Sequence, residues 1–206
     1  MTTTLRQARI DDLDEIYNIS LVTGDAGQDA TPLHRDGKLI GHIYSAPYVT
    51  LSPDTAFVAE DAQGVAGYIV GVHDTLAFQA KLERDWWPAL RDAYPDPKGD
   101  PELWNADEKR IAAIHHPSSA PSAIIQAFPA HIHMNLLSRL RGQGMGTKLL
   151  DLWLSQARDA GVKSVHLGAS ATNANGIGFW GSRGFTRLGP PLVEPSERTV
   201  WFGQTL

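Results

Sequence analysis

The chain of 206 residues contains no cysteine. This absence excludes structural disulfides, a thiolate nucleophile and zinc sites built from four cysteines. The sequence also has no hydrophobic run long enough to span a membrane, and its first ten residues contain no apolar segment of the kind that directs secretion. We therefore expect a cytoplasmic protein that does not bind membranes.

The chain also has fewer basic than acidic residues. The sequence has 18 lysines and arginines against 23 aspartates and glutamates, which gives a net charge of −5. Such a balance argues against nucleic acid as a partner. A hydrophobic content of 42% and a charged content of 20% are typical of a soluble globular protein, and the length fits one domain, which we place at 1–206.

The most informative segment is 131–161. A strand-like apolar run leads into a turn that contains Gly142, Gly144 and Gly146, and a helix is predicted directly afterwards, over 147–160. Glycines let backbone N–H groups converge on a ligand, and the start of a helix adds free N–H donors and a positive dipole end. The turn is therefore suited to holding a phosphate or pyrophosphate.

The spacing of this turn excludes two common phosphate-binding loops. A dinucleotide-binding turn, G-x-G-x-x-G, would need a glycine at Thr147, and a P-loop would need lysine before the hydroxyl residue, whereas the order here is Thr147-Lys148. The pattern that fits is R-x-x-G-x-G, with Arg141, Gly144 and Gly146 at its defined positions.

The order of elements around this pattern adds to its meaning. A strand precedes it and a helix follows, and after these come a further strand at 163–169, a helix at 176–183 and a Gly-Phe pair at 184–185. Over 131–187 the chain resembles the GNAT acetyltransferase superfamily, in which R-x-x-G-x-G is the acetyl-coenzyme A pyrophosphate loop. A glycine-rich turn without a ligand is the alternative.

The resemblance implies a fold of the α/β (α+β) class, with a mixed, mostly antiparallel central sheet and helices on both faces. It also implies acetyl-coenzyme A as cosubstrate. Because coenzyme A is anionic, its site must be locally basic, and Arg139, Arg141 and Lys148 supply that charge. In the family a backbone N–H before the loop binds the acetyl carbonyl, which by position is that of Leu136 or a neighbour. The cofactor-binding residues that follow from the resemblance are Leu136, Leu137, Arg141, Gly142, Gln143, Gly144, Met145, Gly146, Thr147, Asn173, Asn175, Phe179 and Trp180.

The first half of the chain predicts a strand at 5–10, a capped helix beginning at Asp11 and a second helix at about 37–46. The intervening polar loop, 24–36, either borders a substrate cleft or is an ordinary surface connection. Two strands at 55–60 and 65–73 form a hairpin.

Between the third and fourth strands we expect a helical insertion at about 74–129. Its first helix runs over 75–93 and ends or kinks near Trp87 because of Pro88, and its second covers 102–115. The tryptophans of this insertion either line an acceptor pocket or, as a simpler interpretation, pack the insertion on the sheet.

Three segments show a more specific resemblance. They are AFVAEDAQGVAGYIVGV at 56–72, the Trp-Trp-Pro-Ala-Leu helix that ends at Tyr94-Pro95, and Pro-Ala-His-Ile-His at 129–133. Together they are similar to the acetyltransferase-like C-terminal domain of O-GlcNAcase, and most of all to its stand-alone bacterial relatives. In the human multidomain enzyme this domain is thought to have lost a working cofactor loop, whereas this sequence keeps the loop intact. We therefore expect coenzyme A binding, with the acceptor unspecified.

Candidate catalytic residues lie on the strand before the loop. His131, His133 and Asn135 are two residues apart, so on a strand they share one face. A histidine with a pKa near ~6.5 can accept, through water, the proton of an ammonium group whose pKa is near ~10.4. The His-x-His arrangement is similar to that of the serotonin N-acetyltransferase branch, although the segment to the arginine is one residue shorter here. Core histidines, or a two-histidine metal site, are the alternatives; without a third ligand nearby we assign no metal.

The acid for the leaving thiolate is less evident. Many family members place a tyrosine five residues before the phenylalanine of the Gly-Phe pair, and that position here is Trp180. An indole N–H donates a hydrogen bond but does not titrate. The thiolate must then leave unaided, or be protonated by water or another residue.

The resemblance implies an acetyl-coenzyme A-dependent N-acetyltransferase that transfers acetyl directly to a primary amine of a small molecule or protein. The lack of cysteine excludes an acyl-cysteine intermediate and so favours direct transfer. The alternative is a weakly active or inactive acyl-coenzyme A-binding module on the same scaffold. By analogy with the fold, exposed strand edges favour a homodimer.

Overall fold

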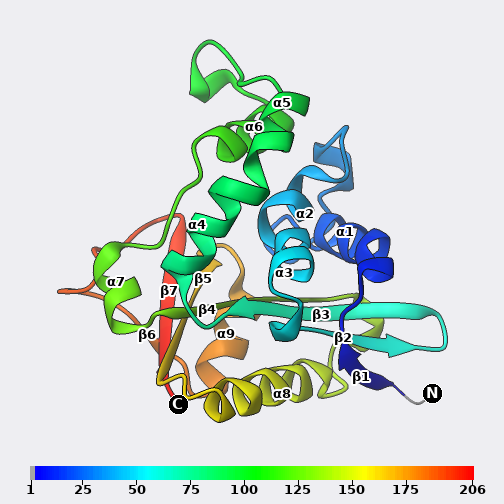
Figure 1. Ribbon diagram of the computed structural model, residues 1–206, viewed down its shortest axis with the longest axis vertical. Coiled ribbons are helices and arrows are strands. Elements are labelled where there is room, and N and C mark those ends of the chain that lie inside the picture. Colours follow the sequence, from blue (N-terminus) through cyan, green and yellow to red (C-terminus); the bar gives the residue numbers. More distant parts are fainter. Residues whose placement is uncertain (1–2) are drawn as a thin grey trace.

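A seven-stranded sheet forms the centre of the computed structural model, which describes residues 3–206 (Figure 1). Its strand order is β1-β2-β3-β4-β5-β7-β6, and all neighbours are antiparallel except β4 and β5. The predicted fold class is confirmed. The strands are β1 (Thr4–Gln7), β2 (Ala56–Asp61), β3 (Gly64–Val72), β4 (Ala130–Leu136), β5 (Ser164–Ser170), β6 (Thr186–Arg187) and β7 (Thr199–Thr205).

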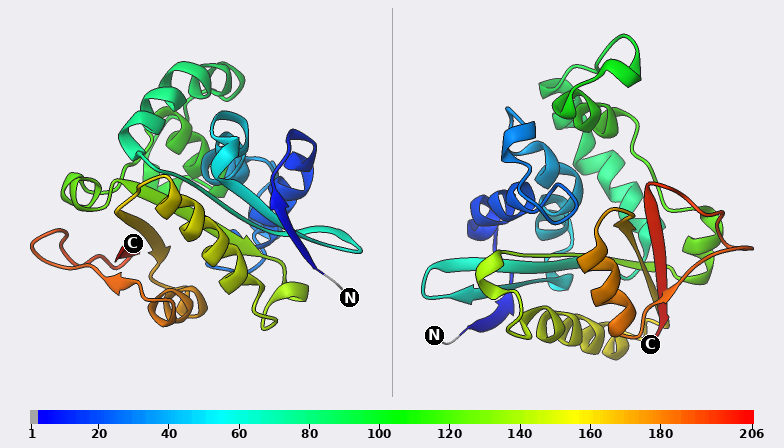
Figure 2. Two further views of the ribbon diagram at one scale, coloured as in Figure 1. Left: turned by 60° about the horizontal axis from the view of Figure 1, so that its bottom comes forward. Right: turned by 180° about the vertical axis from the view of Figure 1, so that it is seen from behind.

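Helices cover both faces of the sheet (Figures 1 and 2). On one face α8 and α9 bury a cluster that includes Leu149, Trp153 and Trp180, and on the other α1, α3 and α4 bury a cluster around Tyr48 and Tyr68. No helix within the described residues is both long and apolar enough to cross a membrane. The helices are α1 (Leu13–Val22), α2 (Leu39–Tyr44), α3 (Ala46–Leu51), α4 (Thr75–Asp85), α5 (Trp87–Ala93), α6 (Ala106–His115), α7 (Ser122–Ala127), α8 (Met145–Asp159) and α9 (Ala174–Ser182).

The helix after the glycine loop, α8, has the clearest sequence basis. Its buried residues recur three and four positions apart, so they form one apolar stripe against the sheet. The indole N–H of Trp153 donates to the carbonyl oxygen of Thr55 at 3.1 Å. Directly beneath the indole lies Gly71 of β3, where a methyl group would overlap the carbonyl oxygen of His131 and the ring of Trp153. The close packing of α8 therefore depends on this glycine.

The predicted insertion is present as α4 to α7, between β3 and β4. The single helix expected at 75–93 is divided at Trp86, because Pro88 lies in the first turn of α5 and cannot donate a backbone hydrogen bond. The start of α6 lies four residues later than predicted, because Asn105 and Glu108 form a reciprocal capping box there. Two short helices that begin near prolines, α3 and α7, were not predicted.

The insertion packs mainly on α2, and the expectation that its tryptophans contact the sheet is corrected. Trp87 is buried together with Leu39 of α2 and Ile114 of α6, and the Trp86 indole donates to the carbonyl oxygen of His42 at 2.9 Å. Asp107 of α6 reinforces this contact. Its carboxylate lies 2.7 Å from Nδ1 of His34 and accepts the backbone N–H of Arg35 at 3.0 Å, and the insertion is thereby fixed to the segment before α2.

Replacing Gly71 with alanine tests the packing of α8. We expect Gly71→Ala to lower the free energy of unfolding by about 1–3 kcal/mol, because the added methyl group meets backbone that cannot rotate away. The matched control is Gly178→Ala in α9, where the methyl group enters open space and should stabilise the protein by about 0.5–1 kcal/mol. Urea denaturation measures both values. Equal stability of the two variants would contradict the packing argument.

Candidate active site

The site begins where β4 separates from β5. The two parallel strands pair only at Ala130–Val165 and His131–His166, so the rest of β4 has no partner on that side. The backbone N–H of Leu137 donates to Ala66 at 2.8 Å, towards β3. Because successive amides of a strand point in opposite directions, the N–H of Leu136 points into the gap left by β5. This is the amide that the sequence analysis assigned to the acetyl carbonyl.

A cavity of about 530 Å³ opens at this gap. It lies between the end of β4, the glycine loop, α9 and the segment after α1. All the predicted cofactor-binding residues line it except Leu137 and Gln143, and the predicted catalytic residue Asn135 lines it too. The lining residues are Thr23, Ala26, Gly27, Gln28, Met134, Asn135, Leu136, Leu140, Arg141, Gly142, Gly144, Met145, Gly146, Thr147, Asn173, Asn175, Gly176, Phe179 and Trp180.

Two of the predicted cofactor-binding residues, Leu137 and Gln143, make their contacts away from the cavity. The side chain of Leu137 packs against the apolar clusters on both faces of the sheet. The side-chain amide of Gln143 donates to the carbonyl oxygen of Arg139 at 2.6 Å. Arg139 itself is ion-paired with Asp61 at 2.9 Å, and this guanidinium holds the pKa of the Asp61 carboxyl below its usual value. Of the three predicted basic residues, only Arg141 lines the cavity.

The glycine loop presents its backbone to the cavity. Gly142 and Gly144 both have φ of +74°, a left-handed conformation that other residues rarely adopt, and nothing lies within 4 Å of where their side chains would be. Within the described residues, the amides of 142–147 form no hydrogen bond to backbone or side chain. A row of free N–H donors thus lies at the N-terminus of α8, where the helix dipole is positive. Anion-binding sites have this arrangement.

Residues of the segment 23–28 line the cavity; the sequence analysis allowed the loop 24–36 to border a cleft but named none of these residues as part of the site. Arg141 connects it to β4: its Nε donates to the carbonyl oxygen of Leu136 at 3.1 Å, and its Nη2 donates to that of Gly27 at 2.9 Å. Thr23 accepts a hydrogen bond from the side-chain amide of Asn135. The polar, glycine-containing composition of the loop that begins at Gly24 was the available signal.

The two candidate histidines lie on the predicted common face, with ring centroids 5.7 Å apart, but their surroundings differ. Both ring nitrogens of His131 are engaged. Thr75 donates its hydroxyl proton to the Pro129 carbonyl at 2.7 Å, so it accepts from Nδ1 of His131 at 2.8 Å. This leaves Nε2 of His131 to accept from the hydroxyl of Tyr48 at 2.7 Å. His131 is thus held as a neutral ring within the structure.

His133 keeps its ring nitrogens free. Its imidazole packs edge-on against Tyr48, with centroids 5.4 Å apart, and forms no hydrogen bond with another described residue. The side chain is partly exposed. Burial, followed by the neighbouring His166, lowers the pKa of His133 to about 4, and burial also lowers the pKa of His131 well below its usual value. Both rings are therefore neutral at physiological pH.

Trp180 occupies the position where a tyrosine was expected. It is 7% exposed, and its ring packs edge-on against those of Phe179 and Phe185, with centroids 5.1 and 5.3 Å away. Among the described residues, no tyrosine, histidine, lysine or carboxylate lines the cavity. The cavity thus supplies hydrogen-bond donors but no side chain that is a suitable acid for a thiolate.

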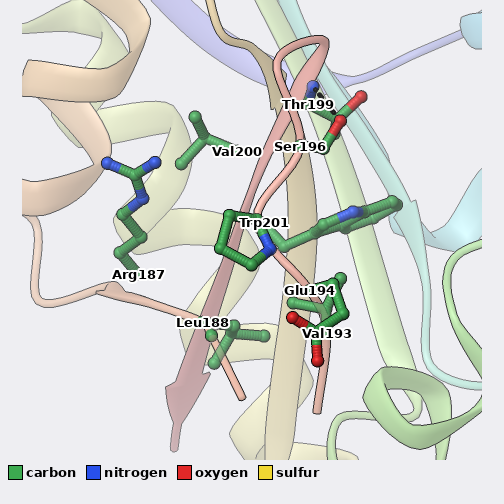
Figure 3. A pocket seen from close by; sticks show the side chains of 10 residues that line it. Arg187, Leu188, Val193, Glu194, Ser196, Thr199, Val200 and Trp201 are labelled. Carbon is green, nitrogen blue, oxygen red and sulfur yellow. Dashed lines mark hydrogen bonds between the residues drawn. The ribbon is translucent and has the colours of Figure 1, made fainter. Parts of the chain in front are cut away.

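A smaller cavity, of about 280 Å³, lies between β6, β7 and the loop that joins them (Figure 3). Trp201, Arg187 and Glu194 are among its lining residues, and none of the predicted site residues is. The predicted chemistry therefore belongs to the larger cavity.

Comparison with known proteins identifies the family. The Acetyltransferase (GNAT) family matches residues 12–185. This chain belongs to the GNAT family. It is accordingly an acetyltransferase of the N-acetyltransferase type, and its cosubstrate is acetyl-coenzyme A, as the resemblance of the glycine loop implied.

Individual relatives agree with the sequence resemblance. The crystal structure of SsHAT has a TM-score of 0.90 and 30% sequence identity, and the match covers 100% of this chain and 98% of that one. Protein O-GlcNAcase of Rattus norvegicus is 26% identical over 162 residues, which are 79% of this chain but 18% of the relative, so the chain spans less than a fifth of that protein. The GNAT fold also matches yncA of Salmonella typhimurium, a putative acetyltransferase solved with acetyl-CoA, at a TM-score of 0.53 and 16% identity, over 100% of this chain and 94% of that one.

The buried histidines make stability depend on pH. Because the pKa values of His131 and His133 lie below 6.5 in the folded protein, the unfolded chain binds more protons between about pH 4 and 6.5. The free energy of unfolding should therefore be undiminished above pH 6.5 and fall as the pH approaches 4. His131→Gln keeps a donor for Thr75 and an acceptor for Tyr48, and should reduce this slope by up to about 1.4 kcal/mol per pH unit. Urea denaturation across this range measures the slope, and an unchanged slope would contradict the assignment.

Proposed function

We propose that this acetyltransferase transfers acetyl directly from acetyl-coenzyme A to a primary amine, with His133 as the base. The observation that carries the proposal is the imidazole of His133, which is neutral and has no hydrogen-bond partner among the described residues. His133 lies two residues before Asn135 on β4, and Asn135 lines the cavity. Two residues of strand span about 7 Å, so an amine beside His133 is close to the gap into which the Leu136 amide points.

The residues of the cavity fit acetyl-coenzyme A. Bound acetyl-coenzyme A supplies a thioester, whose carbonyl carbon is open to attack by an amine. The free amides of 142–147 and the α8 N-terminus suit its pyrophosphate, and the two left-handed glycines leave open the space that a larger residue would fill. The Leu136 amide is positioned to donate to the carbonyl oxygen, where negative charge develops. Asn173 and Asn175 offer further hydrogen bonds along the cavity wall.

The difference in hydrogen bonding between the two histidines supports His133, rather than His131, as the base. Nε2 of His131 already accepts from Tyr48, so a proton taken up there would displace that hydrogen bond. His133 has no such bond to lose, and its lowered pKa keeps the ring neutral at neutral pH, while it also makes the ring a weaker base than an unperturbed histidine. Tyr48 contacts both rings, so we assign His131 a positioning role.

Direct transfer is supported by what the site lacks. The chain has no cysteine to carry an acyl group, and the cavity contributes no titratable acid within the described residues. The departing thiolate, whose thiol has a pKa near ~8.5, then leaves as the anion or takes a proton from water.

The glycine loop is tested by charge insertion. Gly144→Glu should abolish binding of acetyl-coenzyme A, because a carboxylate enters the proposed pyrophosphate site. Gly161→Glu is the matched control, since Gly161 has φ of +80° and open surroundings at the opposite end of α8. That variant carries the same charge and a similar backbone strain, and should bind as the unaltered protein does. Calorimetric titration with acetyl-coenzyme A, beside NADH as a non-binding nucleotide, measures this; equal affinities of the two variants would refute the loop assignment.

The base is tested by His133→Ala. We expect turnover at neutral pH to fall by about 100-fold or more while the affinity for acetyl-coenzyme A is unchanged. In the unaltered enzyme, kcat should stay level as the pH falls from about 8 to 5 and decline only near pH 4, where His133 takes up a proton. His73→Ala is the control, because His73 lies at the end of β3 and contacts Gln156 instead.

Single-turnover release of coenzyme A with a panel of amines provides the readout. An untouched pH–rate profile in His133→Ala would show that histidine is not the base. Binding of acetyl-coenzyme A without release of coenzyme A for any amine would instead favour a coenzyme A-binding module.

A further inference from the structure

Arg110 differs from the other partly buried arginines because it has no ion-pair partner among the residues that the structure describes. Four arginines of the described chain are partly buried, namely Arg6, Arg91, Arg110 and Arg139. Three of them are ion-paired with carboxylates at N–O distances of 2.7–2.9 Å. Arg110 has no carboxylate within 4.0 Å among residues 3–206. Because a guanidinium stays charged at any accessible pH, a partly buried one without a carboxylate partner remains free to bind an anion from outside the chain.

The position of Arg110 connects it with the proposed base. It lies on α6, which packs beside α2 (Figure 1). Its guanidinium carbon is 5.5 Å from the ring centroid of Tyr44, and its Nη1 donates to the Tyr44 hydroxyl at 3.2 Å. The same tyrosine ring has its centroid 5.8 Å from that of His133. Arg110 and His133 both contact the Tyr44 ring. A ligand about as long as three residues of extended chain can therefore reach from one to the other.

Arg110 and Tyr44 together form a donor site. Since the Tyr44 hydroxyl accepts from Arg110, its own proton is free, and no described residue accepts it. The guanidinium retains N–H groups that no described residue accepts. Both side chains are partly exposed. A guanidinium fork beside a hydroxyl donor matches the two oxygens of a planar carboxylate.

We propose that Arg110 and Tyr44 bind a carboxylate of the acceptor, which is therefore a small aminocarboxylate whose amine lies at His133. The inference rests on the proposed function, because it takes His133 as the point where the amine is acetylated. It gives the helical insertion a part in selecting the acceptor, since Arg110 comes from α6, whereas Tyr44 comes from α2.

The surrounding charges support an anionic ligand. Asp107, one turn before Arg110 on α6, is already bound to His34 and to the backbone N–H of Arg35. Asp36, in the same segment, accepts the hydroxyl of Tyr94 at 2.7 Å. His133 is neutral, since burial lowers its pKa. The guanidinium is therefore the positive charge that an anionic acceptor meets beside Tyr44, in a protein whose overall charge is negative.

The test compares acids with their amides. The probes are β-alanine, γ-aminobutyrate and ε-aminocaproate, the three corresponding amides and the matching aminoalkyl phosphonates. In the unaltered enzyme, kcat/KM for at least one acid should exceed that for its amide by about 10- to 100-fold, which is the usual worth of a hydrogen bond to a charged group. Arg110→Gln should remove this preference, mainly by raising KM for the acid, while kcat/KM for the amide stays within about twofold.

Two further variants separate recognition from packing. Arg110→Lys keeps the charge but loses the fork, and should restore part of the preference. Arg91→Gln removes a partly buried, ion-paired arginine of the same insertion and should leave the acid-to-amide ratio unchanged. If Arg110 only packs α6 on Tyr44, Arg110→Gln will alter acids and amides alike, and the proposal is overturned.

The remaining outcomes are distinguishable as well. Equal rates for acids and amides in the unaltered enzyme overturn the aminocarboxylate assignment and leave the proposed function standing. A preference for the phosphonates identifies a phosphate-type acceptor and overturns the carboxylate. If no probe is acetylated, calorimetric titration of the coenzyme A-loaded protein with the acids decides. Binding that Arg110→Gln removes supports the carboxylate site, and absence of binding overturns it; the proposed function is decided separately by the amine panel.

Discussion

The separation of β4 from β5 is the constraint on which the site depends. Two residue pairs hold the parallel strands together, and beyond His131 the outward amides of β4 lose their sheet partner. Such amides are unfavourable unless water or a ligand accepts their hydrogen bonds. The glycine loop adds the free amides of 142–147 at the same opening. The β4 amides that a continuous sheet would pair and the free amides of the loop thus lie around one cavity, where a ligand can accept their hydrogen bonds.

The architecture on either side of the gap keeps it open. At its closed end, Nδ1 of His166 lies 2.6 Å from the Phe128 carbonyl oxygen and Ser164 donates to Ala127 at 2.8 Å, which fixes the start of β5. At the open end, the ring of Phe179 packs closely against Gly146, where a methyl group would be 3.3 Å from it. The aromatic residues of α9 therefore rest on the start of α8, and the two helices form one wall of the cavity. Trp180, buried beside Phe179, belongs to this wall by its packing.

The sequence predicted the parts of the site whose chemistry is local. The R-x-x-G-x-G spacing, the shared face of His131 and His133 and the position of Leu136 all follow from periodicity and a family resemblance. Contacts between distant segments were not accessible in this way. That Thr23 and Gly27 close the cavity depends on how α1 packs, and that Arg139 is paired with Asp61 depends on how the β2–β3 hairpin approaches the loop.

The difference between the two histidines is another feature that depends on contacts between distant segments. Period-two alternation places both rings on one face, but it does not reveal that Thr75 and Tyr48 occupy one ring and leave the other free. Likewise, the tryptophans of the insertion were expected to line an acceptor pocket or to pack on the sheet, yet Trp86 and Trp87 contact α2, which lies more than forty residues away in sequence. Composition identifies which side chains need partners, whereas only the tertiary arrangement decides which partners they find.

Under the proposed function, donor and acceptor are recognised by different means. The proposed cosubstrate site consists of backbone amides and of Gly142 and Gly144, whose left-handed conformation other residues rarely adopt. The proposed acceptor site consists of side chains from α2, α6 and β4, and α6 belongs to an insertion outside the strand order of the sheet. Changes in the insertion can therefore alter the acceptor without disturbing the amides that hold the donor. Backbone recognition of the donor and side-chain recognition of the acceptor meet at β4, where Leu136 and His133 lie three residues apart.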